Sequence, residues 1–259
     1  MIRDGTPDSA GQRRERRSYG TATDDGRFEP LSGTEARSDA EYAAVYARRI
    51  KRGLDLVISI IALAVFVMAL TLLAPAIKLD SRGPVFFQQP RIGIDRRRRR
   101  TPYPARSDRR HVINPGRPFR IFKLRTMCLE AESDGPQLAV ENDERTTRVG
   151  RLLRKTRLDE FPQFVNVLRG EMSVIGPRPD RLYFIRQFEN DVPHYRERLV
   201  VLPGITGLAQ VVNGYDTDLD SVRRKIVLDR QYIDSLSLRN DLRILALTFK
   251  VMLDGEGAR

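Results

Sequence analysis

Two adjacent carboxylates, Asp159 and Glu160, are the residues of this sequence best suited to chemistry. They lie among the cations of the stretch Arg154–Gln163, and Pro162 follows them closely. Because proline has no N–H and fits only the first turn of a helix, a helix that continues past Pro162 begins near Asp159. The free N–H groups there attract phosphate and keep a carboxylate ionised, and an ionised carboxylate attacks phosphorus without a base. The alternative is a simple helix cap.

Cationic side chains in two other segments suit a phosphate substrate. Apolar and basic residues alternate through Pro118–Met127 with the period of a strand, so Lys123 and Arg125 share one face. They suit a diphosphate, or they are only the polar edge of a solvent-facing strand. Arg178 lies between Pro177 and Pro179, which restrict the backbone and hold it extended. We interpret Arg178 as a preorganised phosphate ligand rather than an incidental arginine in a rigid loop.

The composition favours an anionic partner. The chain has 46 Lys+Arg and 34 Asp+Glu, a net charge of +12 over 259 residues, which suits one domain of ordinary size with appendages. Nucleic acid, acidic lipid and sugar nucleotides all fit this charge. The single cysteine, Cys128, excludes an internal disulfide, and the two separated histidines argue against a zinc site.

The apolar run Leu54–Ile77 carries one charge, Asp55, and predicts a membrane-associated helix within residues 46–82. A straight helix of this length would reach ~36 Å, longer than the ~30 Å hydrocarbon core. Basic residues flank both ends, which places both in the cytoplasm and favours a re-entrant segment over a spanning one. Because Pro75 comes late, we expect the chain to bend within Ser59–Thr71, where small and hydroxylated residues accommodate freed backbone groups.

Short strands and helices must position the candidate side chains. We expect an α/β fold of the α+β type, mostly helical, in which a small cytosolic catalytic domain over residues 83–253 follows the membrane-inserted helix. We expect three strands: a short one through Val85–Gln89, after the turn at Gly83-Pro84, a second in Pro118–Met127 and a third at Met172–Ile175. We expect one helix with an apolar stripe of Val149, Leu152 and Leu153, and another through Phe164, Val165 and Leu168.

Other segments are polar or highly charged. Residues 1–45 have few large apolar side chains and predict a disordered arm, and residues 254–259 form a short tail. Residues 95–116, with the run Arg96–Arg100, predict an exposed insertion that contacts anionic lipid, binds nucleic acid or is simply solvated. A rival interpretation is a membrane-tethered basic protein that binds nucleic acid or anionic lipid, but it gives Asp159 and Glu160 no role.

Several motifs follow one another along the chain from about Lys51 to Leu253. After the apolar run come Lys78–Phe87, Phe122–Met127, Leu158–Gln163, Asn166–Gly170, Gly176–Pro179, Pro203–Gln210 with Asn213-Gly214, and Leu228-Asp229…Tyr232…Leu238…Asp241-Leu242. In this order they resemble the bacterial sugar transferases that are monotopic polyprenyl-phosphate phosphoglycosyl transferases. Three features differ from the family: Pro75 comes later than the usual helix-breaking proline, residues 95–116 look inserted, and Leu208 stands where tryptophan is common.

The resemblance implies a two-step transfer. Asp159 is the nucleophile that attacks the phosphate nearer the sugar of a UDP-sugar, UMP leaves, and polyprenyl (undecaprenyl) phosphate then attacks the covalent phosphosugar. Glu160 is the acidic partner of Asp159 and a ligand of the cofactor Mg²⁺. The further substrate-binding residues implied by the resemblance are Lys123, Arg125, Arg154, Arg178 and Asp229.

The same resemblance implies a cellular setting. It places the protein at the bacterial inner membrane, with the catalytic domain on the cytoplasmic face, the acceptor held in membrane lipid and no nucleic acid as a partner. The reaction would be the first membrane step in assembling an exopolysaccharide, a capsule, an O-antigen or a glycoprotein glycan.

Overall fold

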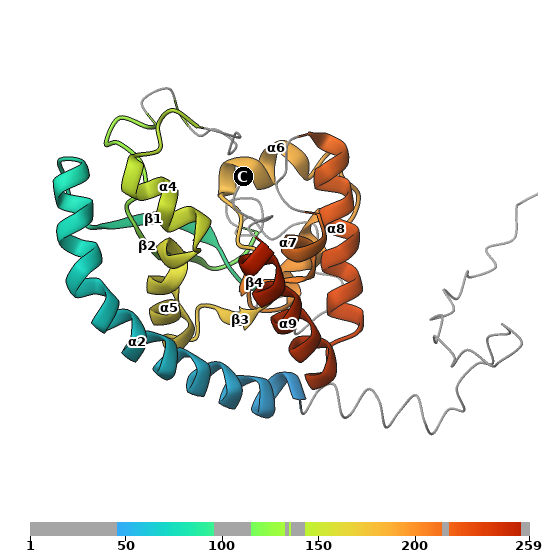
Figure 1. Cartoon of the computed structure of the whole chain (residues 1–259). Coiled ribbons are helices and arrows are strands. Elements are labelled where there is room, and N and C mark those ends of the chain that lie inside the picture. Colours follow the sequence, from blue (N-terminus) through green and yellow to red (C-terminus); the bar gives the residue numbers. More distant parts are fainter. Residues whose placement is uncertain (1–45, 96–114, 133–134, 136–142, 214–217, 255–259) are drawn as a thin grey trace, which may run out of the picture. The chain divides into compact units, whose positions relative to one another are not determined.

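The computed structural model describes residues 46–95, 115–132, 135, 143–213 and 218–254, which belong to the unit Tyr46–Arg259 (Figure 1). The expected arm, most of the arginine-rich insertion, Gly214 and the tail beyond Asp254 lie outside the described residues. The described part is mostly helical, as expected. Its elements are η1 (Tyr46–Ile50), α2 (Lys51–Asp80), β1 (Phe86–Ile92), β2 (Pro118–Leu124), α4 (Arg148–Lys155), η2 (Leu158–Gln163), α5 (Phe164–Leu168), β3 (Ser173–Ile175), α6 (Leu182–Phe188), η3 (Tyr195–Val200), β4 (Gly204–Thr206), α7 (Leu208–Val212), α8 (Leu219–Asp234) and α9 (Leu238–Asp254).

Among the described residues, two small sheets carry the strands. β1 and β2 form an antiparallel hairpin in which Phe86 pairs with Leu124 and Ile92 with Pro118. β3 and β4 pair in parallel. The three expected strands are therefore present. A core cluster lies where β2, α5, β3, α8 and α9 meet and consists of Phe119, Ile121, Val167, Met172, Val174, Ile175, Tyr232 and Ile244.

Helix α2 is unbroken from Lys51 to Asp80, and it passes through Pro75 without interruption. The expected release of backbone groups within residues 59–71 is therefore wrong. Instead the helix curves as a whole (Figure 1). The Thr71 hydroxyl is bonded within the helix, where Oγ1 donates to the carbonyl of Met68 at 2.7 Å. Such a bond and a proline within one turn of each other are sufficient causes of helix curvature.

One side of α2 packs on the protein and the other is apolar and exposed. Phe66 and Ile77 are buried in a cluster with Leu124 and Leu153. Within the described residues, α2 is long and apolar enough to cross a membrane, yet only 11% of its most apolar window is buried. A core helix of a soluble domain would be covered on both sides. The outward side chains, with exposed fractions between 52% and 77%, are Val57, Ile60, Ile61, Val65, Val67, Met68 and Leu72.

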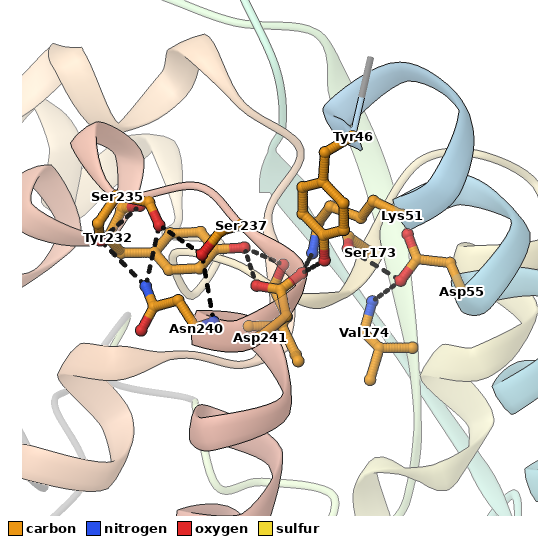
Figure 2. A network of polar contacts seen from close by, with 11 residues as sticks. Tyr46, Lys51, Asp55, Ser173, Val174, Tyr232, Ser235, Ser237, Asn240 and Asp241 are labelled. Atoms are coloured by element: carbon orange, nitrogen blue, oxygen red, sulfur yellow. Dashed lines mark hydrogen bonds and ion pairs between the residues drawn. The ribbon is translucent and has the colours of Figure 1, made fainter. Parts of the chain in front are cut away.

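A buried polar network fixes the N-terminal end of α2 to α9 (Figure 2). The Asp241 carboxylate accepts hydrogen bonds from the Tyr46 hydroxyl at 2.5 Å, from Lys51 Nζ at 2.6 Å and from the Tyr232 hydroxyl at 3.0 Å. Asp241 is only 5% exposed. One carboxylate therefore joins η1, α2 and α8 to the first turn of α9.

The charge within the apolar run, Asp55, fixes α2 to β3 (Figure 2). Its Oδ1 atom accepts hydrogen bonds from Ser173 Oγ at 3.0 Å and from the Val174 amide at 2.9 Å. Asp55 is 4% exposed, so its polarity is satisfied by the strand rather than by water. This explains how a carboxylate is accommodated in an otherwise apolar helix.

The C-terminal end of α2 is held by Arg125, which follows β2. Its guanidinium donates to the carbonyl oxygens of Ile77 at 3.2 Å, of Ser81 at 2.6 Å and of Arg82. Carbonyls at a helix C-terminus lack helical partners, so a cation there satisfies them and complements the dipole. Both ends of α2 are thus bonded to the same unit.

We expect Asp241→Ala to lower the free energy of unfolding by about 3 kcal/mol or more, because Lys51 and two tyrosine hydroxyls lose their shared acceptor in a buried site. Thermal and urea denaturation of the detergent-solubilised protein would measure the loss. The control is Asp220→Ala, which removes a carboxylate from an exposed ion pair with Arg223 and should cost less than about 1 kcal/mol. Equal losses for the two variants would contradict the anchoring role of Asp241.

Candidate active site

Asp159 and Glu160 lie in the first turn of η2, as the sequence predicts. The helix begins at Leu158, directly after Arg157, whose φ of 56° lies in the left-handed region. A non-glycine residue is uncommon there, and Arg157 marks the turn between α4 and η2. Both carboxylates are buried, with exposed fractions of 6% for Asp159 and 7% for Glu160. They are more than an exposed helix cap.

Two cations from distant segments meet Glu160. Lys123 Nζ lies 2.8 Å from Glu160 Oε1, and Arg178 Nη2 lies 2.7 Å from the same oxygen. Lys123 Nζ is also 3.9 Å from Asp159 Oδ2. The structure therefore brings Lys123 and Arg178 to the carboxylate pair, and both are bonded to Glu160 rather than to Asp159.

The two carboxylates have opposite pKa shifts. The pKa of Asp159 is raised to about 6: burial and the charge of Glu160 raise it, and the charges of Lys123 and Arg154 partly oppose this rise. Burial also disfavours ionised Glu160, but the charges of Arg178 and Lys123 outweigh burial and hold its pKa well below the usual range. The pKa of Asp159 thus lies above the ordinary aspartate value, because desolvation outweighs the effect of the short helix. Asp159 is still mostly ionised at pH 7.

Lys123 faces inward from β2. It shares one face of the strand with Phe119 and Ile121, which are buried in the core. Burial lowers the pKa of Lys123, and the charge of Glu160 opposes that shift. The alternative of a solvent-facing strand edge is therefore wrong for Lys123.

Asn166 fixes the distance between β2 and η2. Its Nδ2 atom donates to the carbonyl of Arg120 at 2.7 Å, and its Oδ1 atom accepts from the Phe122 amide at 3.1 Å. Asn166 is fully buried in α5, the helix that continues η2. It therefore satisfies main-chain hydrogen-bonding groups on the edge of β2 and keeps Lys123 aligned with Glu160.

Arg154 reaches the site from α4. Its Nε atom donates to Thr126 Oγ1 at 3.1 Å, and its charge lowers the pKa of Asp159. The close approach of α4 requires glycine, because a Cβ on Gly150 would lie 2.1 Å from the Thr126 carbonyl oxygen. The apolar stripe expected on this helix is only partly correct, since Leu152 is 60% exposed.

Two of the expected substrate-binding residues, Arg125 and Asp229, have other partners. Arg125 is bonded to the carbonyls at the end of α2, so it does not stand beside Lys123 at the carboxylate pair. Asp229, on α8, forms an ion pair with Arg198 in which Nε lies 2.9 Å from Oδ2. Arg198 in turn donates to the carbonyl of Arg178 at 2.6 Å. Asp229 is thus connected to the site through Arg198.

Residue patterns did not identify Arg198 or Arg91, which hold the backbone of the Gly176–Pro179 loop. Arg91, at the end of β1, donates to the carbonyl of Pro179 at 3.1 Å. Burial lowers the pKa of Arg91 to about 10, and the neighbouring Arg178 charge lowers it as well. Neither arginine belongs to a local motif, so only the tertiary structure reveals their roles.

Phe161, directly after Glu160, connects the site to α2. Its ring centroid lies 6.1 Å from that of Phe66 on α2 and 5.6 Å from that of Phe164 on α5. The carboxylate pair is therefore one residue away from the contact with the apolar helix.

The donor set fits Mg²⁺ only when it is shared with a substrate. The described residues contain no group of three or more His, Cys, Asp or Glu side chains that would form a complete protein site. Mg²⁺ commonly binds through one or two carboxylates together with substrate phosphates. Glu160 suits this role because it stays anionic, and the contacts of Lys123 and Arg178 to Oε1 leave Oε2 for a metal.

Comparisons with known proteins identify the family of this chain. Residues 46–255 match the family described as bacterial sugar transferase. The chain is 44% identical over 210 residues to a UDP-N-acetylgalactosamine-undecaprenyl-phosphate N-acetylgalactosaminephosphotransferase of Aeromonas hydrophila, covering 81% of this chain and 45% of the relative. It is 40% identical over 213 residues to a UDP-glucose:undecaprenyl-phosphate glucose-1-phosphate transferase of Caulobacter vibrioides, a match that covers 80% of this chain and 71% of the relative. It is 37% identical over 204 residues to a transferase of the same name from Escherichia coli, a match that covers 78% of this chain and 39% of the relative. The chain therefore belongs to the bacterial sugar transferase family.

Proposed function

We propose that this chain transfers a phosphosugar from a UDP-sugar to undecaprenyl phosphate, releasing UMP. The names of its relatives specify UDP-sugar donors and undecaprenyl phosphate as the acceptor. The observation that carries the proposal is that the two buried carboxylates have different partners. Glu160 pairs closely with both Lys123 and Arg178, whereas Lys123 Nζ lies 3.9 Å from Asp159. Asp159 is thus the carboxylate whose oxygens are less engaged by cations and better suited to attack phosphorus.

The proposed reaction has two displacements at one phosphorus. An Asp159 oxygen attacks the phosphate nearer the sugar, the bond to the second phosphate breaks, and UMP leaves with that electron pair. A phosphate oxygen of undecaprenyl phosphate then attacks the same phosphorus and displaces Asp159. The product is a polyprenyl-diphospho-sugar, and the carboxylate is regenerated.

Charge neutralisation is the main demand on the site, because a carboxylate and a diphosphate repel each other. Lys123 and Arg178 are placed to offset this repulsion once a donor phosphate competes with Glu160 for them. Mg²⁺ held by Glu160 and the donor phosphates would supply additional positive charge at the leaving group. Arg154 offers a further cation on the α4 side of Asp159.

We further propose that α2 lies in the inner membrane without crossing it. Its exposed side is apolar, while Asp241 and Asp55 near one end and Arg125 at the other bind α2 to the unit that carries the site. A helix bonded at both ends to one unit would have to carry that unit into the bilayer in order to span. With the site on the cytoplasmic face, the UDP-sugar is accessible and the acceptor never leaves its membrane.

Asp159→Asn should reduce UMP release from UDP-sugars by at least about a thousandfold, because an amide cannot form the acyl phosphate. The measurement is UMP production by membranes or purified protein over a panel of UDP-sugars with undecaprenyl phosphate. The matched control is Asp220→Asn, an exposed carboxylate on α8, which should retain full activity. A parent protein that releases no UMP from any donor would instead favour the basic binding protein.

The dependence of kcat/KM on pH should have an acidic limb near pH 6. Only ionised Asp159 attacks, and its raised pKa of about 6 means that activity is present above that pH and falls about tenfold per pH unit below it. Lys123→Met should move the limb to higher pH, because the Lys123 charge is the largest effect that lowers this pKa. Lys155→Met, an exposed change on α4, should leave the limb in place. A limb near pH 4 in the parent would contradict the assignment.

Both ends of α2 should face the cytoplasm. Single cysteines at the exposed positions Arg49 and Arg82, in a Cys128→Ser background, should react with a membrane-impermeant thiol reagent only after the cells are lysed. Arg49 is a better site than Tyr46, which is fully buried. Labelling of one position alone in intact cells would establish a spanning helix.

A further inference from the structure

The backbone of the Gly176–Pro179 loop is held by more than its prolines. Four successive carbonyls, from Pro177 to Asp180, accept hydrogen bonds from three separate parts of the chain. The acceptors and donors are Pro177 with the Gly204 amide at 2.9 Å, Arg178 with Arg198 Nη2 at 2.6 Å, Pro179 with Arg91 Nη1 at 3.1 Å, and Asp180 with the Ile92 amide at 3.0 Å. Two of these donors are main-chain groups and two are arginine side chains.

Arg198 is distinctive because its guanidinium makes two hydrogen bonds and one ion pair. Nη1 donates to Asp180 Oδ2, Nη2 to the carbonyl of Arg178 at 2.6 Å, and Nε lies 2.9 Å from Asp229 Oδ2. Arg198 is 3% exposed and Asp229 1%. The planar fork is thereby fixed in orientation, with one edge directed at the main chain of Arg178.

The acidic partners of Arg198 are themselves fixed. Asp180 also accepts from the Tyr195 hydroxyl at 2.6 Å and from Lys225 Nζ at 3.1 Å. Burial disfavours its charge, but the Arg198 and Lys225 charges hold the pKa of Asp180 far below its usual range, so the cluster is ionised. A buried ionic cluster contributes little net stability compared with apolar packing, so stability alone does not account for it.

We propose that Arg198, oriented by Asp229 and Asp180, is a positioning residue for the transfer reaction. It fixes the main chain of Arg178 so that the guanidinium of Arg178 meets Glu160 and the donor phosphates. The Arg178 side chain is a third exposed, long and rotatable, so the position of its guanidinium depends on where its backbone is held. Asp229 then acts through Arg198 and not on the substrate. This inference rests on the proposed function only for its kinetic test.

The test is Arg198→Lys in the full chain. Lysine keeps the charge between Asp180 and Asp229, but a single ammonium cannot also reach the Arg178 carbonyl in the fork geometry. We expect kcat/KM for the UDP-sugar to fall about 10- to 100-fold, because a misdirected phosphate ligand loses effective positioning. The matched control is Tyr195→Phe, which removes one hydrogen bond from the same Asp180 carboxylate and leaves the three Arg198 contacts in place. It should change kcat/KM less than threefold.

A double-variant cycle separates positioning from general destabilisation. If Arg198 acts through Arg178, Arg198→Lys should cost less than about threefold when it is added to Arg178→Ala. A purely structural role would give the full cost in both backgrounds and overturn the proposal. Should Arg198→Lys fail to fold, Asp229→Asn replaces it, with a smaller loss in the same direction and the same dependence on Arg178.

Binding of UDP, measured by titration of the detergent-solubilised protein, provides a readout without turnover. Weaker UDP binding by Arg198→Lys than by Tyr195→Phe would support the positioning role. This holds even if the parent releases no UMP, a result that would contradict the proposed function but not the positioning role. Equal binding and equal kcat/KM for these two variants, with an active parent, would overturn the positioning role and leave the proposed function intact.

Discussion

The burial of two adjacent carboxylates is the constraint on which the rest of the structure depends. Removing Asp159 and Glu160 from water is unfavourable unless positive charge accompanies them, and the chain supplies it from β2 and from the Gly176–Pro179 loop. Because both cations bond to Glu160, the cost of burial appears as a raised pKa on Asp159 alone. One carboxylate is stabilised as an anion and its neighbour is left comparatively reactive.

Each cation reaches the pair through a separate supporting structure. Lys123 depends on the β1–β2 hairpin and on Asn166, which ties that hairpin to α5. Arg178 depends on a loop whose carbonyls are bonded to β1, η3 and the start of β4. The site is therefore assembled almost entirely from contacts that are distant in sequence, as expected for a geometry that must be held closely.

Local patterns predicted the parts of this structure that depend on local physics. Proline chemistry located the start of η2, and alternation located β2, although it did not decide whether Lys123 faces inward. The roles of Arg125 and Asp229 were not predictable in the same way, because they depend on which carbonyls or charges lie opposite them after folding. The curvature of α2 without a break also escaped prediction, since the helix accommodates Pro75 and the Thr71 side-chain bond without losing its continuity.

The contact between Phe66 and Phe161 has a consequence for how the acceptor arrives. It ties the proposed nucleophile to the side of α2, so with α2 in the bilayer, as also proposed, the site stays at a constant depth beside the lipid headgroups. A lipid-linked phosphate then meets Asp159 by lateral diffusion within the membrane plane. The encounter is a two-dimensional search, and its rate is governed by the surface density of the acceptor rather than by its concentration in solution.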